Sequence, residues 1–264
     1  MPHASLNGID VYYERSGEGP TLLYFNGTGA TLESSRLSID PYTKHFDVVV
    51  HDQRGLGATE APPGPYTMAD YATDGRALLD HLGLDRVRVV GTSFGGMVAQ
   101  EFAITFPERV ERLALLCTSA GGKGGSSYPL GELAALPPAE RRAKGMSVVD
   151  SRWTEEWLAE HELDRMIADV ISTAVSAEPG SDRERGEKGQ VAARADHDAW
   201  DRLPLITAPT LVAAGRYDGV APLANSEAIA SRIPGAELRA YEGGHVFFFQ
   251  DPTAIPEIIE FLNG

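Results

Sequence analysis

The motif G-x-S-x-G spans Gly91–Gly95 and can supply a serine nucleophile, Ser93. It lies between the apolar run Val87–Val90 and a helix-like stretch, which predicts a strand-to-helix turn. Glycines on both flanks leave room for a strained serine with an exposed hydroxyl, and the Phe94 N–H can face a developing oxyanion. The alternative interpretation is a glycine-rich turn whose serine only caps the helix.

Two further side chains can activate that serine. A serine hydroxyl is a weak nucleophile and needs an imidazole base that a carboxylate orients. Asp218 follows the strand-like run Leu211–Ala214, and His245 follows a strand-like run that ends at Tyr241. Because the carboxyl ends of parallel strands share one edge of a sheet, we expect both side chains to lie near Ser93.

Simpler interpretations of the acid and the histidine stay open. An aspartate before a glycine often only forms a turn, and His245 can cap the apolar run Phe247–Phe249 without doing chemistry. The two glycines before His245 favour a close backbone approach, a setting that the other histidines lack. Neither an H-E-x-x-H motif nor a Cys/His pair is present, so we expect no metal site of the zinc type.

Alternating strand-like and helix-like segments position these residues. Short apolar runs separated by helical patterns predict an α/β fold with a mostly parallel central sheet flanked by helices. The expected strands cover residues 11–13, 21–25, 46–50, 87–90, 110–117, 210–214 and 237–241. The expected helices lie near residues 34–44, 68–82, 95–106, 223–233 and 252–262.

The alternation stops after Cys117 and resumes near residue 204. The intervening residues are polar, helix-prone and without a strand-like run. We interpret residues 121–203 as an inserted helical lid on a core formed by residues 1–120 and 204–264. The glycine-rich run 121–127 predicts a flexible connection, because its spacing does not match that of a phosphate-binding loop.

The composition excludes several classes of partner. Of 264 residues, 42% are hydrophobic and 23% are charged, and no apolar run is long enough to span a membrane. The formal net charge of −15 argues against nucleic acid, since phosphate binding needs a positive field. Neither a signal peptide nor a basic amphipathic helix is visible, so we expect a cytoplasmic protein that binds no membrane. The single cysteine, Cys117, is expected to pack in the core.

These features together resemble the α/β-hydrolase fold family over essentially the whole chain. In this resemblance Ser93 is the nucleophile, Asp218 the acid and His245 the base. The segment Asp52–Thr59, DQRGLGAT, is similar to the family pattern D-x-R-G-x-G-x-S, with threonine in place of the last serine.

The segment Asn26–Gly29 stands where many members of the family carry H-G-x-G. The resemblance implies that the Thr28 amide is a second oxyanion donor beside that of Phe94. Asn26 replaces the usual histidine, which leaves a backbone donor in place but changes the polarity beneath the oxyanion hole.

The segments Pro63–Asp70 and Gly95–Glu101 are most similar to the 3-oxoadipate enol-lactonase and small-ester hydrolase branch. This resemblance implies a cofactor-independent serine hydrolase that cleaves a carboxylic ester or lactone through an acyl-enzyme. Two other activities use the same triad: the cofactor-free haloperoxidases, or perhydrolases, and the carbon–carbon bond hydrolases. A non-catalytic ligand receptor can also keep this fold.

Three residues are candidates for the substrate pocket. Asn26 is one of them, from its place beside the predicted oxyanion hole. Trp153 and Trp157 are four residues apart and expected on one helical face, where they either pack the lid on the core or line the pocket. If they line it, the substrate is partly apolar or aromatic.

Overall fold

The computed structural model describes residues 2–134, 136–172 and 180–264, and within them the chain forms one eight-stranded sheet. The strand order is β1-β2-β4-β3-β5-β6-β7-β8. The strands are β1 (His3–Leu6), β2 (Ile9–Ser16), β3 (Thr21–Phe25), β4 (Asp47–His51), β5 (Val87–Thr92), β6 (Val110–Leu116), β7 (Thr210–Gly215) and β8 (Glu237–Tyr241). Strand β2 is antiparallel to both of its neighbours, and the pairs from β4 to β8 are all parallel. The predicted mostly parallel sheet is confirmed.

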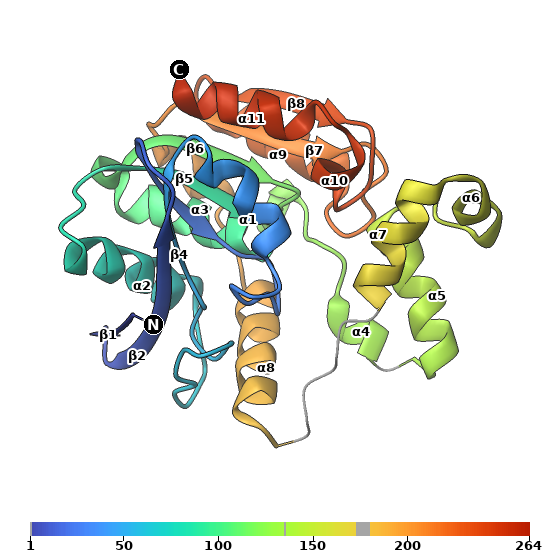
Figure 1. The fold of residues 1–264 in the computed structure, drawn as a ribbon, viewed down its shortest axis with the longest axis horizontal. Helices are drawn as coiled ribbons and strands as arrows, with labels where there is room; N and C mark the ends of the chain where they lie inside the picture. Colours follow the sequence, from blue (N-terminus) through green and yellow to red (C-terminus); the bar gives the residue numbers. More distant parts are fainter. Residues whose placement is uncertain (1, 135, 173–179) are drawn as a thin grey trace.

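Helices cover both faces of this sheet (Figure 1). The helices that follow strands are α1 (Arg36–Thr43), α2 (Met68–His81), α3 (Phe94–Thr105), α9 (Leu223–Arg232), α10 (Phe247–Gln250) and α11 (Ala254–Asn263), with a short 3-10 helix, η1, at Pro107–Arg109. Side chains of β3 alternate between two hydrophobic cores, as strand geometry requires. Leu23 and Phe25 pack with α2, α3 and α9, whereas Leu22 and Tyr24 pack with α1 and α11.

Strand β1 and helix α10 were not among the expected elements. Strand β1 is only four residues long, and its alternating burial arises from pairing with β2. Asn7 and Gly8 connect the two strands with φ of 49° and 79°, the left-handed values that an Asn-Gly hairpin turn needs. The Asn-Gly pair was therefore the available signal for β1. Helix α10 begins at Phe247, two residues after His245.

The chain between β6 and β7 is helical, as expected. Its elements are η2 (Gly122–Gly124), α4 (Leu130–Ala134), α5 (Pro138–Val149), α6 (Glu155–Glu160), α7 (Glu162–Ser172), α8 (Asp182–Ala195) and η3 (Trp200–Leu205). Figure 1 shows α5, α6 and α7 grouped beside the sheet and α8 apart from them. The division into a core and a 121–203 lid stays a prediction, and within it residues 135 and 173–179 lie outside the described residues. None of the described helices has the length and apolar composition needed to cross a bilayer.

Helix α8 packs closely on the core through two glycines. A Cβ on Gly186 would collide with the carbonyl oxygen of Gly55, and a Cβ on Gly189 would collide with the ring of Tyr66. Glycine lets the two backbones approach this closely because it has no side chain. The position of α8 therefore depends on contacts with residues more than a hundred positions earlier in the chain.

The glycine-rich run 121–127, the predicted flexible connection, makes hydrogen bonds in the described structure. Gly121 pairs with Asp198 in an isolated β-bridge, and its N–H donates to Gly125. Asn225 of α9 donates a side-chain N–H to the Ser126 carbonyl. These bonds hold the run against the core, because its backbone groups find partners there instead of in water.

Candidate active site

Ser93 occupies a tight turn between β5 and α3. Its backbone has φ of 56° and ψ of −115°, a conformation that costs free energy in a residue with a Cβ. Two hydrogen bonds hold the turn: the Ser93 N–H donates to Leu116 at 2.8 Å, and the Thr118 hydroxyl donates to the Ser93 carbonyl at 2.7 Å. The neighbouring strand β6 and the residues after it thus maintain the strained serine.

The two glycines of the motif are required by close backbone contacts. A Cβ on Gly91 would collide with the Gly95 carbonyl, and a Cβ on Gly95 would collide with the Phe25 carbonyl. The turn therefore packs directly on the end of β3. The same packing brings the loop after β3 to the nucleophile, since a Cβ on Gly27 would lie 3.7 Å from the Ser93 Cβ.

Ser93, His245 and Asp218 form a continuous hydrogen-bonded chain. His245 Nε2 lies 2.9 Å from Ser93 Oγ, and His245 Nδ1 lies 2.8 Å from Asp218 Oδ2. The other carboxylate oxygen, Asp218 Oδ1, accepts N–H groups from Val220 at 2.7 Å and Ala221 at 2.8 Å. The Asp218 side chain is fully buried, whereas the His245 ring is 15% exposed. This arrangement lets the imidazole take a proton from the serine while a fixed carboxylate faces its other nitrogen.

The end of α5 packs against the loops that carry the acid and the base. The Val149 carbonyl accepts the His245 N–H at 2.6 Å, and the Val148 carbonyl accepts the Gly219 N–H at 2.9 Å. A Cβ on Gly244 would collide with Val149, so this glycine permits the contact. The glycines before His245 thus fit a close backbone approach, and its partner comes from the helical segment.

The two predicted oxyanion donors belong to the residue after Ser93 and to the loop that approaches Ser93 from the end of β3. Phe94 is the first residue of α3 and is fully buried, and Thr28 lies in the loop after β3. Among the described residues, neither backbone N–H donates to a protein acceptor. Both amides are therefore free to donate to an oxygen of a bound molecule.

Gln190 of α8 holds the loop that carries Thr28. Its Oε1 accepts the Gly29 N–H at 2.8 Å, across 161 residues of sequence. Gln190 is fully buried, and its Nε2 is without a hydrogen-bond partner in the described part of the chain. Sequence reasoning missed this residue, since nothing in a polar helix marks which side chain reaches the core.

The DQRGLGAT segment, residues 52–59, also stabilises the loop after β3. Asp52 accepts N–H groups from Leu32 at 2.6 Å and Ala58 at 2.9 Å, and a Cβ on Gly57 would collide with its carboxylate. Arg54 makes two 2.7 Å hydrogen bonds to Asp74, both residues being buried. Asp52 thus stabilises the loops after β3 and β4, and Arg54 links the segment to α2.

Asn26 is buried beside the nucleophile turn. Its carbonyl accepts Gln53 Nε2 at 2.7 Å, and a Cβ on Gly95 would collide with that same carbonyl. Its own Nδ2 is buried without a partner among the described residues. The asparagine thus leaves a polar hydrogen-bond donor beneath the predicted oxyanion hole.

Trp153 and Trp157 do not share a helical face, which corrects that prediction. Helix α6 begins at Glu155, because Thr154 caps it by accepting the Trp157 N–H, so Trp153 precedes the helix. Trp157 stacks on His161 with ring centroids 3.7 Å apart, and its Nε1 donates to Asp164 at 2.6 Å. These contacts lie within the helical segment itself.

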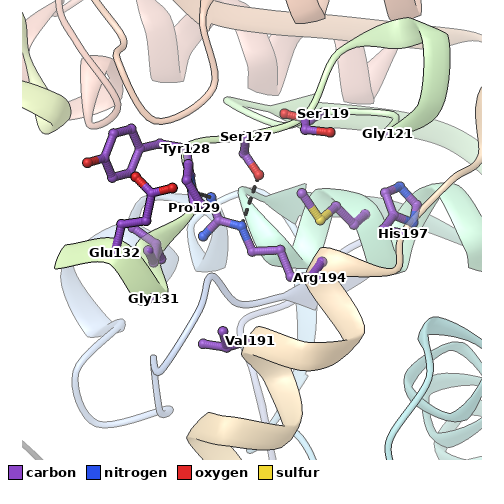
Figure 2. A pocket seen from close by; sticks show the side chains of 14 residues that line it. Ser119, Gly121, Ser127, Tyr128, Pro129, Gly131, Glu132, Val191, Arg194 and His197 are labelled. Carbon is purple, nitrogen blue, oxygen red and sulfur yellow. Dashed lines mark hydrogen bonds between the residues drawn. The ribbon is translucent and has the colours of Figure 1, made fainter. Parts of the chain in front are cut away.

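A cavity of about 460 Å³ lies between residues 119–132, helix α3 and helix α8 (Figure 2). Asn26, Trp153 and Trp157 lie outside its lining, and so does Ser93. Met97, one helical turn beyond Ser93, and Ser119 belong to it. Its other polar residues include Arg194 and His197, which were not predicted as site residues.

Comparison with known proteins agrees with this geometry. A family model described as the alpha/beta hydrolase fold matches residues 20–252. The chain is 31% identical over 253 residues to a poly(3-hydroxyalkanoate) depolymerase of Ectopseudomonas oleovorans, covering 92% of this chain and 84% of that one. It is 28% identical over 243 residues to 3-oxoadipate enol-lactonase 2 of Acinetobacter baylyi, covering 91% and 87%. The crystal structure of the enol-lactonase from Burkholderia xenovorans LB400 matches all of both chains with a TM-score of 0.80 at 25% identity.

Proposed function

Because the chain belongs to the α/β-hydrolase fold family and is a hydrolase, we propose that it cleaves a carboxylic ester or lactone through an acyl-enzyme on Ser93. The observation that carries this proposal is the hydrogen-bonded chain Ser93–His245–Asp218, with distances of 2.9 and 2.8 Å. The named activities of the depolymerase and the two enol-lactonases, which act on ester or lactone bonds, support it.

In the first half of the reaction, Ser93 Oγ attacks the carbonyl carbon while its proton passes to His245 Nε2. The carbonyl oxygen becomes an oxyanion, which accepts the N–H groups of Thr28 and Phe94. The tetrahedral intermediate then expels the alcohol oxygen, which takes the proton from His245. For a lactone, this alcohol stays attached to the acyl group.

In the second half, water replaces the alcohol. His245 removes a proton from the water, the resulting hydroxide attacks the acyl carbon, and the same two amides hold the second oxyanion. Collapse of that intermediate returns the proton to Ser93 Oγ and releases the acid. Asp218 faces the protonated imidazole in both halves and stabilises its positive charge.

Ser93→Ala tests the proposal. The variant should lose at least about 10⁴-fold in kcat on 4-nitrophenyl acetate and on an enol-lactone, since residues of a triad act as a unit. Ser231→Ala, at an exposed position of α9, is the matched control and should keep the wild-type rate. A fluorophosphonate should label the wild-type chain and not Ser93→Ala.

Other outcomes separate the alternatives. Unchanged ester turnover in Ser93→Ala would exclude the proposed nucleophile. Failure of the fluorophosphonate to label the wild-type chain would indicate a ligand receptor. A panel that includes peroxide with acetate, and a carbon–carbon bond substrate, distinguishes the remaining activities that the triad can support.

A further inference from the structure

One amide side chain connects the loop of the proposed base to the helical segment between β6 and β7. Gln250, the last residue of α10, accepts the Gly244 N–H through Oε1 at 2.8 Å. Its Nε2 donates to Asp150 Oδ2 and to Asp164 Oδ1, both at 2.9 Å. Asp150 follows α5 and Asp164 lies in α7, and Figure 1 shows α10 beside α7. Because Gly244 immediately precedes His245, this amide links the base to both helices.

A carboxamide side chain suits this set of bonds. It offers a carbonyl oxygen as acceptor and an NH2 group with two donors, so one side chain satisfies a backbone N–H and two carboxylates. The reverse orientation of the amide would place its oxygen against both carboxylates. The hydrogen-bond partners therefore fix which end of Gln250 faces the loop of His245.

The two carboxylates are buried, and each is held by another donor. The Asp150 side chain is 0% exposed and pairs with Arg152 Nη2 at 2.7 Å. Asp164 is 7% exposed, and its Oδ2 accepts Trp157 Nε1 at 2.6 Å. A buried carboxylate loses its hydration, so it is stable only where donors of fixed geometry replace the water. These donors hold both acceptors in place, and the acceptors in turn fix the position of Gln250.

The backbone before His245 needs such contacts because it consists of two glycines. Gly243 and Gly244 have no Cβ, and glycine has the greatest backbone freedom when no partner restrains it. A Cβ on Gly243 would lie 2.7 Å from Gln250 Oε1, so the glycine is what lets the amide approach. The His245 N–H donates to the Val149 carbonyl at 2.6 Å. Two successive N–H groups are thus held from outside the loop.

The same contacts extend to the loop of the acid. The Gly243 carbonyl accepts the Tyr217 N–H at 2.9 Å, and Tyr217 immediately precedes Asp218. The Tyr217 carbonyl accepts the Ser151 N–H at 2.9 Å, and the Arg152 guanidinium carbon lies 4.1 Å from the centre of the Tyr217 ring. The loops of acid and base therefore both contact the residues that follow α5.

We propose that Gln250 is a positioning residue for His245, and that it makes the alignment of the base depend on the docking of the helical segment through Asp150 and Asp164. This inference rests on the proposed function. Gln250 acts through the Gly244–His245 peptide, which sets where the imidazole meets the nucleophile. A displacement of about 1 Å can cost about 100-fold in rate, whereas a merely structural contact would change stability alone.

Gln250→Met removes the amide and keeps the length of the side chain. On 4-nitrophenyl acetate, kcat should fall about 10-fold to 100-fold and KM should stay within about threefold, because the residue aligns the base and does not bind the ester. The rate is taken per active site, counted by the end point of fluorophosphonate labelling. Asn263→Met, which removes an exposed amide at the end of α11, is the matched control and should keep the wild-type kcat.

A donor–acceptor swap tests the link to the helical segment. Asp164→Asn can keep its oxygen on Trp157, which turns its NH2 group toward that of Gln250, so kcat should fall about tenfold. Gln250→Glu can still accept the Gly244 N–H but brings a third carboxylate beside the two aspartates, and should lose as much as Gln250→Met. In the double variant the NH2 group faces the introduced carboxylate. It should be at least about fivefold more active than Gln250→Glu alone, since a donor again meets an acceptor.

Other results overturn the proposal. Unchanged kcat in Gln250→Met, or a rise in KM alone, would refute the positioning role. Losses that multiply in the double variant would refute the link to the helical segment. If Gln250→Met does not fold, the swap variants decide, because they keep polar side chains at both positions.

A measurement without substrate separates this proposal from the proposed function. If no ester is hydrolysed, the proposed function fails, and NMR of the chain labelled with [15N]histidine still tests the positioning of His245. The wild-type chain should show His245 mainly with its proton on Nδ1, which faces Asp218, and His245→Gln identifies the signal. Gln250→Glu should show a mixture of both tautomers. The same single tautomer in both chains would refute the proposal.

Discussion

The sheet edge that carries the triad and the cavity wall near α8 differ in whether their polar atoms have hydrogen-bond partners. At the sheet edge, both ring nitrogens of His245 and both oxygens of Asp218 have hydrogen-bond partners. At the wall, one nitrogen each of Arg194 and His197 is buried without a partner in the described chain, and so is one nitrogen of Gln190 earlier in α8. Buried polar atoms are ordinarily satisfied, so unpartnered ones gathered near one site call for a ligand or a bound water.

The difference separates chemistry from recognition. Proton transfer needs groups held in place before the substrate arrives, because reorganisation during the reaction would raise the barrier. Recognition needs the opposite, donors that remain available until a ligand binds them. Helix α8 contacts both regions, since Gln190 accepts the Gly29 N–H and Arg194 lines the cavity.

The largest expected effect comes from a substitution in the triad at the sheet edge. Asp218→Asn can still accept the Val220 and Ala221 N–H groups through Oδ1, so we expect the fold to persist. It cannot stabilise the imidazolium or hold the same tautomer, and kcat should fall by about 10³-fold to 10⁴-fold. Steady-state kinetics on 4-nitrophenyl acetate measure this loss. Asp201→Asn, at an exposed acid of η3, is the control, and an active Asp218→Asn would remove the acid from the mechanism.

A second prediction concerns how the stability of the fold depends on pH through the buried ring of His197. His197 has a pKa of about 4 in the folded chain and about 6.5 when unfolded, so only the unfolded state gains this proton between those values. Its contribution to stability is complete above pH 6.5 and is lost as the pH falls toward 4. At pH 5 the free energy of unfolding should therefore be about 2 kcal/mol lower than at pH 8 because of this group.

Urea unfolding of His197→Gln at the two pH values measures that contribution. Glutamine does not titrate. The fall in the free energy of unfolding from pH 8 to pH 5 should therefore be about 2 kcal/mol smaller in the variant than in the wild-type chain. His81→Gln, an exposed histidine, should leave the fall unchanged. Equal pH dependence in His197→Gln and the wild type would mean that the ring is not buried in solution.

The smallest expected effect tests the contact between the two regions. Gln190→Met keeps the side-chain volume but removes the oxygen that accepts the Gly29 N–H. Because Gly29 adjoins Thr28, the oxyanion loop should lose its alignment, and kcat should fall about tenfold with KM for a neutral ester unchanged. The rate of fluorophosphonate labelling should fall in parallel, since the phosphonyl oxygen uses the same amides.

Lys188→Met, at an exposed position of the same helix, is the control for Gln190→Met. A rise in KM with kcat unchanged would assign Gln190 to substrate binding instead of to the loop. Unchanged kinetics in both variants would mean that the oxyanion loop is aligned without α8.

The part of the fold that sequence could predict was the part with strong local signals. Buried parallel strands produce apolar runs, and the helices between them repeat every 3.6 residues, so the sheet was recognisable from β2 to β8. The expectation that Ser93, Asp218 and His245 meet followed from one rule, that parallel strands end at a common edge. Trp153 was misplaced because the Thr154 cap, and not the spacing of the tryptophans, decides where α6 begins.

The sequence by itself thus determined the order of elements, the G-x-S-x-G turn and the positions of an acid and a histidine after later strands. Only the tertiary structure decided which face of α8 meets the core. Gln190 reaches Gly29 across 161 residues, and Arg194 reaches Ser127 across 67. A polar helix shows no periodic signal for such contacts, because its side chains are of the same kind whether they face water or a site. Burial alone turns Arg194 from a solvated surface charge into an unpaired cation, and burial is a property of the packed molecule.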